Sequence, residues 1–218
     1  MNKFHVVFIS TPGSIGNLVP TVEFARHLTN HDPRFLATIL MIDMSERPLV
    51  TSYIQSCEST ATNINFINLP PVDPPSTHDY QTSLGYMCLL VTKHELHVKN
   101  AIANLITSCA ETESRVVGFF VDMFCTSMID VANELNIPCY LYFASPELGL
   151  GVEIRLDYRE GGDLVSPAEL ERALRRLMEG DVEVRRKFLE MKEKSRMALM
   201  PNGSSYKALA SLIEELTA

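Results

Sequence analysis

The beginning of the chain combines an apolar run, a glycine-bearing turn and an amphipathic segment, and this order constrains the fold most strongly. Residues 5–10 are apolar and rich in β-branched side chains, which predicts a buried parallel strand. Pro12, Gly13 and Gly16 interrupt this pattern and predict a turn. From Leu18 onward, apolar residues recur at helical spacing. A strand, a glycine-bearing loop and a helix form the first unit of a doubly wound α/β domain, which directs backbone N–H groups toward the crevice at the edge of its sheet.

Two residues define the predicted start of this helix. Pro20 falls in the predicted first turn, where a missing N–H group costs little. Asn17 precedes the apolar pattern, and its side chain can accept a hydrogen bond from a free N–H group of that turn. The sequence therefore predicts a helix that starts just after Asn17, with Asn17 as its N-cap.

Strand and helix patterns alternate up to about residue 145. Apolar or alternating runs predict further strands at residues 35–43, 63–69, 116–123 and 138–144. Helices are predicted at residues 47–57 and 126–135, with one long or broken helix at residues 81–109. The proline-rich residues 70–79 are predicted to form a loop. This alternation predicts an α/β fold, a Rossmann-like parallel sheet with helices on both faces.

The last third of the chain predicts a helical tail. Residues 151–157 alternate like a strand. Ser166, Pro167 and Glu169 then form a capping box with proline at the first helical position, which predicts the start of a helix. Two more helices are predicted at residues 182–200 and 204–216.

Charge and cysteine content limit the partners and the compartment. The 218 residues carry a formal net charge of −8, which argues against a nucleic-acid partner because phosphate binding requires a basic face. The five cysteines are widely spaced without a CxxC pair, which predicts reduced, buried thiols in the cytosol. The first strand is predicted within a few residues of Met1, so we expect no signal peptide, and no apolar run reaches membrane-spanning length. We therefore expect a cytoplasmic protein without a membrane span.

Three stretches of the chain carry a family resemblance. They read PGSIGNLVPTVEFARHL at residues 12–28, VVGFFVDMFCTSMIDVANELNIPCYLYFASP at residues 116–146, and ELGLGVEIRLDYREGGDLVSPAELERALRRLME at residues 147–179, followed by GSSYKALASLIEEL. They resemble plant family-1 UDP-sugar-dependent glycosyltransferases, especially the branch that acts on flavonoids and other phenolics. The resemblance implies a two-domain GT-B enzyme that transfers glucose from UDP-glucose to a hydroxyl of a small phenolic acceptor.

The resemblance also implies that the middle of a longer chain is missing. In the family a long segment separates the second stretch from the third, whereas here they adjoin at Pro146–Glu147. Residues 1–146 then correspond to the Rossmann-like acceptor-binding domain, and residues 147–218 to a remnant of the C-terminal donor domain. The family's donor-binding box, which is rich in Trp, His, Gly and Gln, has no counterpart, and the chain contains no Trp. We expect no donor-binding residues and no cofactor, although UDP-glucose is the donor co-substrate of the family.

Two residues match the catalytic positions of the family. Asp122 matches the aspartate that orients a catalytic histidine, and it ends a predicted parallel strand, where α/β sheets place their sites. Asn17 stands at the position of that histidine, and an amide cannot accept a proton near neutral pH. Asn17 is therefore either the helix N-cap or a group that hydrogen-bonds an acceptor hydroxyl or the Asp122 carboxylate. In an active chain, another base would serve or Asp122 would act through water.

An acceptor pocket is implied at the same edge of the sheet. It is expected to form from residues 11–17, the region around Met87, residues 122–125 and residues 144–147. Its predicted members are Gly13, Gly16, Met87, Phe124, Cys125 and Ser145. Core packing is the alternative for the apolar residues around Met87.

A histidine pair offers a weaker signal for a metal. His94 and His97 form an HExH pattern rather than the HExxH pattern that places two imidazoles one helical turn apart. This spacing favours a polar helix face, and we expect no metal site.

Two functions from different classes follow from these observations. The first is sugar transfer to a phenolic acceptor. The second is an inactive, truncated glycosyltransferase remnant that at most binds acceptor, or that self-associates through apolar residues such as Val152 and Ile154, left without their sheet. Binding of a UDP-sugar separates the two.

Overall fold

The chain forms two compact units. The computed structural model of the 218 residues describes residues 3–44, 48–58, 63–142, 167–178 and 182–218. The first unit comprises Met1–Ala144 together with Leu212–Ala218, and the second comprises Ser145–Ser211. The end of the chain thus belongs to the unit that holds the sheet. The assignment of residues 147–218 to a donor domain stays a prediction.

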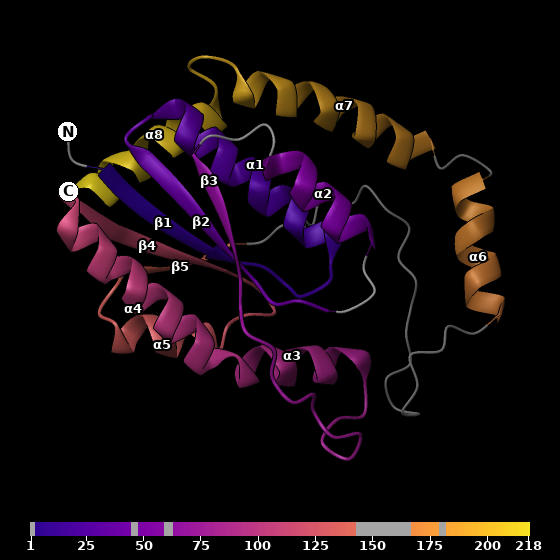
Figure 1. The fold of residues 1–218 in the computed structure, drawn as a ribbon. Helices are drawn as coiled ribbons and strands as arrows, with labels where there is room; N and C mark the ends of the chain where they lie inside the picture. The colour runs from indigo at the N-terminus through magenta and orange to yellow at the C-terminus, as the bar shows by residue number, and fades with distance from the viewer. Residues whose placement is uncertain (1–2, 45–47, 59–62, 143–166, 179–181) are drawn as a thin grey trace. The chain divides into compact units, whose positions relative to one another are not determined.

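The first unit is built on a parallel sheet with the strand order β3-β2-β1-β4-β5 (Figure 1). The predicted strands are confirmed to within a few residues, as far as the structure describes them. Their bounds are β1 (Lys3–Ile9), β2 (Phe35–Met41), β3 (Ile64–Asn68), β4 (Ser114–Asp122) and β5 (Cys139–Tyr142). The order reverses between β1 and β4, and such a switch point opens a crevice at the carboxyl ends of the strands.

Helices cover both faces of this sheet, which confirms the predicted α/β class. Figure 1 shows α1 (Ile15–His31) and α2 (Pro48–Glu58) on one face. The other face carries α3 (Ser83–Lys93), α4 (Glu95–Glu111) and α5 (Met128–Glu134). Side chains alternate along each strand, so Val7 and Val121 pack toward α3, α4 and α5 while Phe8 packs toward α1.

Aromatic rings pack between α1 and the sheet directly below the carboxyl edge. Phe120 stacks on Phe8 and on Tyr140, with ring centroids 4.9 Å apart in both pairs. Phe24 from α1 meets Phe120 edge-on at 5.5 Å. Phe8 is fully buried, so this cluster holds β1 and β4 in register where their loops begin.

Two predictions about helix α1 are wrong. The helix begins at Ile15 with Ser14 as its N-cap, because the Ser14 carbonyl accepts the first helical bonds, from Asn17 at 3.2 Å and Leu18 at 2.9 Å. Asn17 is therefore the third helical residue and not the N-cap. Pro20 lies inside the helix rather than in its first turn, where it removes one N–H donor from the ladder.

Of the long or broken helix predicted at residues 81–109, the broken form is found, because His94 separates α3 from α4. His94 is only 2% exposed, and its Nδ1–H donates to the carbonyl of Leu90 at 2.7 Å. The prediction of a polar, solvated face is therefore wrong for His94. All five thiols are free, but Cys88 is exposed, so the prediction of buried cysteines is wrong for that residue.

The end of α8 (Ser204–Thr217) belongs to the sheet unit. Leu216 is buried beside Gly118 of β4, where even a methyl group would lie 3.1 Å from the leucine side chain. The hydroxyl of Tyr140 donates to Glu215 at 3.0 Å, and Arg115 donates to the carbonyl of Thr217 at 3.1 Å. One apolar contact and two hydrogen bonds thus attach the last turns of α8 to strands β4 and β5.

The second unit contains α6 (Pro167–Met178), α7 (Val182–Leu199) and the beginning of α8. The sequence predicts helices at these positions, and the start of α6 at Pro167 is confirmed. Ser166 of the capping box and the strand predicted at residues 151–157 lie outside the described residues. Charged side chains three or four residues apart pair along α6 and α7, as Arg175 does with Glu171 at 2.8 Å.

Candidate functional site

The candidate site lies where β1 and β4 end side by side. Val121 pairs with Ile9, so the residues that follow β1 meet the last residue of β4. Thr11 follows β1, and Asp122 is the last residue of β4. This is the switch point of the sheet, where α/β folds bind their ligands.

Asp122 is buried within a set of hydrogen-bond donors. Its side chain is 1% exposed, and its Oδ2 accepts from the backbone N–H of Thr11 at 2.5 Å and from the Thr11 hydroxyl at 2.6 Å. Its Oδ1 accepts from the backbone N–H of Phe124 at 3.0 Å. Three donors satisfy the buried carboxylate and fix its position.

Thr11 connects Asp122 to Asn17. The Thr11 hydroxyl gives its proton to Asp122, so its oxygen can only accept from Asn17, whose Nδ2 lies 2.7 Å away. The first turns of α1 place Asn17 above this threonine, and its side chain is half-buried. The carbonyl Oδ1 of Asn17 is then the end of a hydrogen-bonded chain that begins at Asp122.

A second chain of hydroxyls braces α1 against β5. Thr21 donates to the backbone carbonyl of Asn17 at 2.8 Å, so the contact between Thr21 and Tyr142 requires the tyrosine to donate. Burial raises the pKa of Tyr142 to about 12, because the phenolate would lose its hydration there. Tyr142 is therefore a neutral donor that holds the turn carrying Asn17.

Sequence reasoning missed two members of this site, Thr21 and Tyr142, and it placed Thr11 in the expected pocket without its contact to Asp122. A hydroxyl residue directly after a buried first strand is a usable signal for Thr11, because the carboxyl edges of parallel strands meet. No comparable signal identifies the other two, since their contact joins residues that are distant in the sequence.

The predicted acceptor-binding residues are only partly placed at this edge. Phe124 supplies its N–H to Asp122, and Cys125 is buried behind the carboxylate, where burial and the nearby Asp122 raise its pKa. Cys125 is therefore a neutral thiol and not a nucleophile. Gly13 lies in the loop after Thr11 with a φ of 66°, which favours glycine, and Gly16 is exposed in α1.

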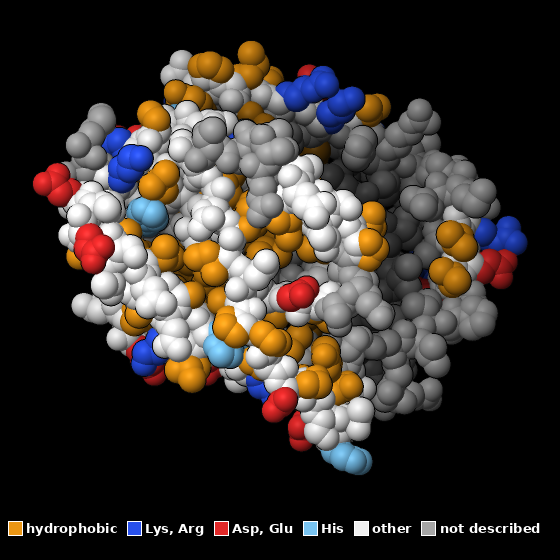
Figure 2. All heavy atoms as spheres, viewed as in Figure 1, with side chains coloured by type: hydrophobic (Ala, Val, Ile, Leu, Met, Phe, Trp, Pro, Cys, Tyr) orange, Lys and Arg blue, Asp and Glu red, His pale blue; other side chains and the backbone are white. Residues whose placement is uncertain are grey.

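Helix α3 approaches the site from the opposite face of the sheet. Met87 is half-buried in α3, and one turn later Leu90 and Val91 pack in the same cluster as Val121 and Cys125. Ser145 lies outside the described residues. Leu84 is 53% exposed and Met123, next to Asp122, is 43% exposed. In Figure 2 hydrophobic side chains gather where Figure 1 places α3.

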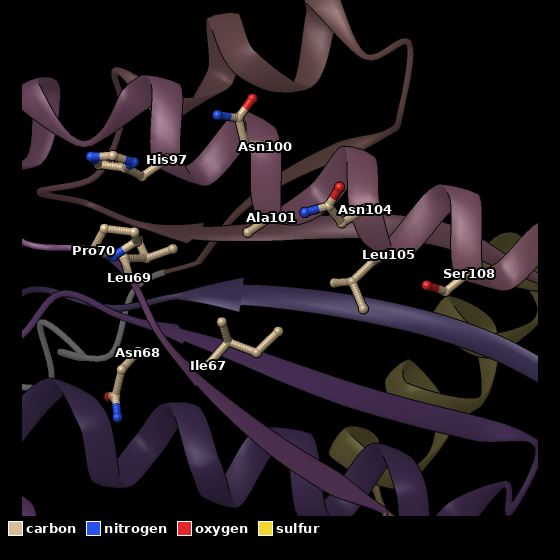
Figure 3. A pocket seen from close by; sticks show the side chains of 10 residues that line it. All are labelled: Ile67, Asn68, Leu69, Pro70, His97, Asn100, Ala101, Asn104, Leu105 and Ser108. Atoms are coloured by element: carbon tan, nitrogen blue, oxygen red, sulfur yellow. The ribbon is translucent and has the colours of Figure 1, made fainter.

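Among the described residues, a cavity lies on each side of the carboxyl half of the sheet. One, of about 350 Å³, lies between α4 and β3; Figure 3 shows Ile67 directed into it and Asn68 directed away from α4. The other, of about 290 Å³, is lined by Gly13, the end of β2, one side of α2 and Asn68. The second cavity shares the Gly13 loop with the candidate site.

The arrangement can orient a hydroxyl ligand but holds no free base among these residues. Asp122 is buried beneath its hydrogen-bond donors. The group left at the end of the hydrogen-bonded chain is the amide oxygen of Asn17, which accepts a hydrogen bond without accepting the proton. Within the described residues no three His, Cys, Asp or Glu side chains come together as a group that could hold a metal ion. Nor does any described helix have both the length and the apolar character needed to cross a membrane.

A five-stranded parallel sheet, helices on both faces and a buried carboxylate at the switch point define a Rossmann-like α/β domain with its site at the carboxyl edge. No protein-family model matches the sequence. A curated relative, UDP-glycosyltransferase 43 of Pueraria montana var. lobata, is 50% identical over 159 residues, which cover 72% of this chain and 34% of the relative.

Solved structures agree with this match. UGT71G1 of Medicago truncatula, solved with UDP-glucose, is 32% identical with a TM-score of 0.59. The match covers 76% of this chain and 36% of the UGT71G1 chain. Phytolacca americana UGT2, solved with UDP-2fluoro-glucose and pterostilbene, is 26% identical with a TM-score of 0.57. The match covers 69% of this chain and 32% of the UGT2 chain. The chain is a relative of the plant UDP-glycosyltransferases, as the resemblance implied, and it spans about a third of their length.

Proposed function

We propose that this chain carries the acceptor side of a UDP-sugar-dependent glycosyltransferase and binds a small phenolic acceptor at the carboxyl edge of its sheet. The observation that carries the proposal is the hydrogen-bonded chain from Asp122 through Thr11 to Asn17. It presents one oriented amide oxygen to a ligand hydroxyl, beside exposed apolar side chains such as Met123 that suit an aromatic ring.

In the reaction of a complete transferase with this acceptor side, which needs the donor part that this chain lacks, the acceptor oxygen forms a bond to the anomeric carbon of the sugar. The bond from that carbon to UDP breaks, and UDP leaves with the electron pair. Asn17 accepts a hydrogen bond from the acceptor hydroxyl and orients it, and water takes the proton because the amide cannot. Asp122 does not touch the acceptor in this scheme, since its oxygens are already occupied.

The donor side forms the second part of the proposal. The chain contains no Trp and no counterpart of the family's donor box, so we infer that it binds acceptor without UDP-glucose. Residues 147–218 are, on this proposal, the remnant of a donor domain. The five free thiols fit a reducing compartment, and we place the protein in the cytoplasm.

Titration with a flavonol tests this proposal. Kaempferol is expected to bind the intact chain saturably, and Asn17→Ala is expected to weaken binding about threefold to tenfold through loss of one neutral hydrogen bond. Asn133→Ala, exposed in α5 and outside both cavities, is the matched control and should leave binding unchanged. UDP or UDP-glucose should not raise the melting temperature, because only a ligand of the native state stabilises it. A saturable shift with UDP would contradict the donor part, and equal binding by both variants would contradict the site.

A further inference from the structure

The cavity between the Gly13 loop and α2 is chemically different from the candidate site beside it. It encloses about 290 Å³ over the carboxyl ends of β2 and β3. Its polar lining includes the carboxylate of Asp43, the amides of Gln55 and Asn68 and the hydroxyl of Thr51, and no Lys or Arg is among the described residues that line it. Within the described part of the chain, the side chains of Asp43, Gln55 and Asn68 have no hydrogen-bonding partner.

The strand and the helix beside the cavity direct these polar side chains into it. Asn68 is directed away from α4, as Figure 3 shows, and lines this cavity on the α2 side of the sheet. Thr51 and Gln55 are four residues apart and share one side of α2. Apolar side chains of the same helix, Val50 and Ile54, complete the wall.

A carboxylate, two amides and a hydroxyl match the hydroxyl groups of a sugar, because they offer several acceptors and donors without a positive charge. The apolar wall suits the C–H face of a pyranose ring. The negative charge of Asp43 disfavours a phosphate group in this cavity, and so the diphosphate of UDP. Its volume corresponds to about ten water molecules, which is sufficient for one hexose.

The cavity and the candidate site share one short loop. Thr11 donates a hydrogen bond to Asp122 in the candidate site, and Gly13 lines the cavity. These two residues are two positions apart, so at most about 7 Å of backbone separates the candidate site from the cavity. A ligand can therefore place one hydroxyl at Asn17 and a second group in the cavity.

We propose that this cavity is a subsite for a sugar already attached to the phenolic acceptor, so that the chain recognises glycosides in preference to aglycones. This inference rests on the proposed function for the aromatic part of the ligand. The cavity itself is expected to bind a simple sugar ring weakly, independently of that function.

Calorimetric titration of the intact chain with kaempferol, kaempferol monoglucoside and methyl β-glucoside tests the subsite. The monoglucoside is expected to bind at least fivefold more tightly than kaempferol. Asp43→Asn should weaken monoglucoside binding about tenfold, because a hydrogen bond to a charged group becomes a neutral one, while kaempferol binding stays within twofold. Gln55→Ala should act in the same direction. Asp73→Asn removes another exposed carboxylate outside the cavity and is the matched control.

The outcomes separate this inference from the proposed function. If kaempferol binds but the monoglucoside binds no more tightly, or if Asp43→Asn and Gln55→Ala have no effect, the subsite is wrong and the proposed function stands. If methyl β-glucoside binds in an Asp43-dependent manner while kaempferol does not bind, the sugar site stands and the phenolic site is wrong. Binding of none of the three compounds overturns both.

Discussion

Helices α7 and α8 follow one another in the chain but differ in what their apolar side chains contact. In α8, Ile213 and Leu216 are buried at 7% and 4% exposure. In α7, Leu189 and Met197 are 55% and 59% exposed. A helical pattern therefore identifies both elements equally well, but it does not show which of them contributes to a core.

The difference follows from the partner each helix has. The last turns of α8 lie against Gly118, where the missing side chain leaves room for Leu216. Helix α7 instead carries pairs of opposite charge, as between Glu190 and Lys194 at 2.6 Å. Such exposed pairs contribute little because water and salt screen them, whereas a fully buried leucine contributes about 2 kcal/mol.

Between the two helices, Leu216→Ala in α8 should have the largest effect on stability. It removes a buried side chain from the contact between α8 and β4, and we expect a loss of about 2–4 kcal/mol in the free energy of unfolding. Urea unfolding followed by circular dichroism measures this loss.

Leu189→Ala in α7 is the matched control for Leu216→Ala. Its side chain is more than half exposed, so we expect a change of less than about 0.5 kcal/mol. Equal losses for the two variants would show that α7 is buried as deeply as α8 and would remove the contrast between them.

Tyr142→Phe tests a polar contact within the sheet unit and should have a smaller effect than Leu216→Ala. It removes the hydrogen bond from Tyr142 to Thr21, with an expected cost of about 1 kcal/mol at neutral pH. Because the pKa of Tyr142 is raised to about 12 from an ordinary value near 10, its stabilising contribution is complete below about pH 10. That contribution is lost as the pH rises toward 12.

The cost of Tyr142→Phe should therefore shrink between neutral pH and about pH 11, because only the wild-type chain gains from ionising this group on unfolding. Urea unfolding at both pH values measures the two costs. A cost that stays constant would mean that Tyr142 is as hydrated in the folded chain as in the unfolded chain.

The sequence predicts the sheet better than it predicts the site. The central strands are identified because their apolar runs are buried on both sides, as in residues 117–122 of β4, and that pattern is local. The start of α1 is not located correctly because Asn17 and Ser14 are both good N-cap residues, and only the backbone shows that the Ser14 carbonyl starts the ladder. The position of the break at His94 could not be predicted from the neighbouring residues, because no Gly or Pro marks it. The structure shows instead a hydrogen bond from the His94 side chain to the carbonyl of Leu90.

The candidate site combines a residue that the resemblance identifies with contacts that it does not. Asp122 is identified by its match to the family aspartate, and the structure places it in a network with Thr11. The resemblance does not show that Thr11 stands between Asp122 and Asn17. The hydrogen bonds that connect the three residues depend on the register between β1 and β4, which brings the ends of the two strands together. Hydroxyl networks of this kind require the three-dimensional register.

The smallest effect is expected for Glu190→Gln in α7. The hydrogen bond and positive charge of Lys194 lower the pKa of Glu190, so the pair contributes at neutral pH and fades as acid protonates the carboxylate. Because the Glu190 side chain is exposed, we expect no measurable change in the melting temperature of the chain. A slight loss of helical circular dichroism at low ionic strength should disappear at about 1 M salt, where screening removes the interaction. A clear drop in melting temperature at high salt would mean that the pair is shielded from solvent, which would place α7 against a partner surface as α8 is placed against β4.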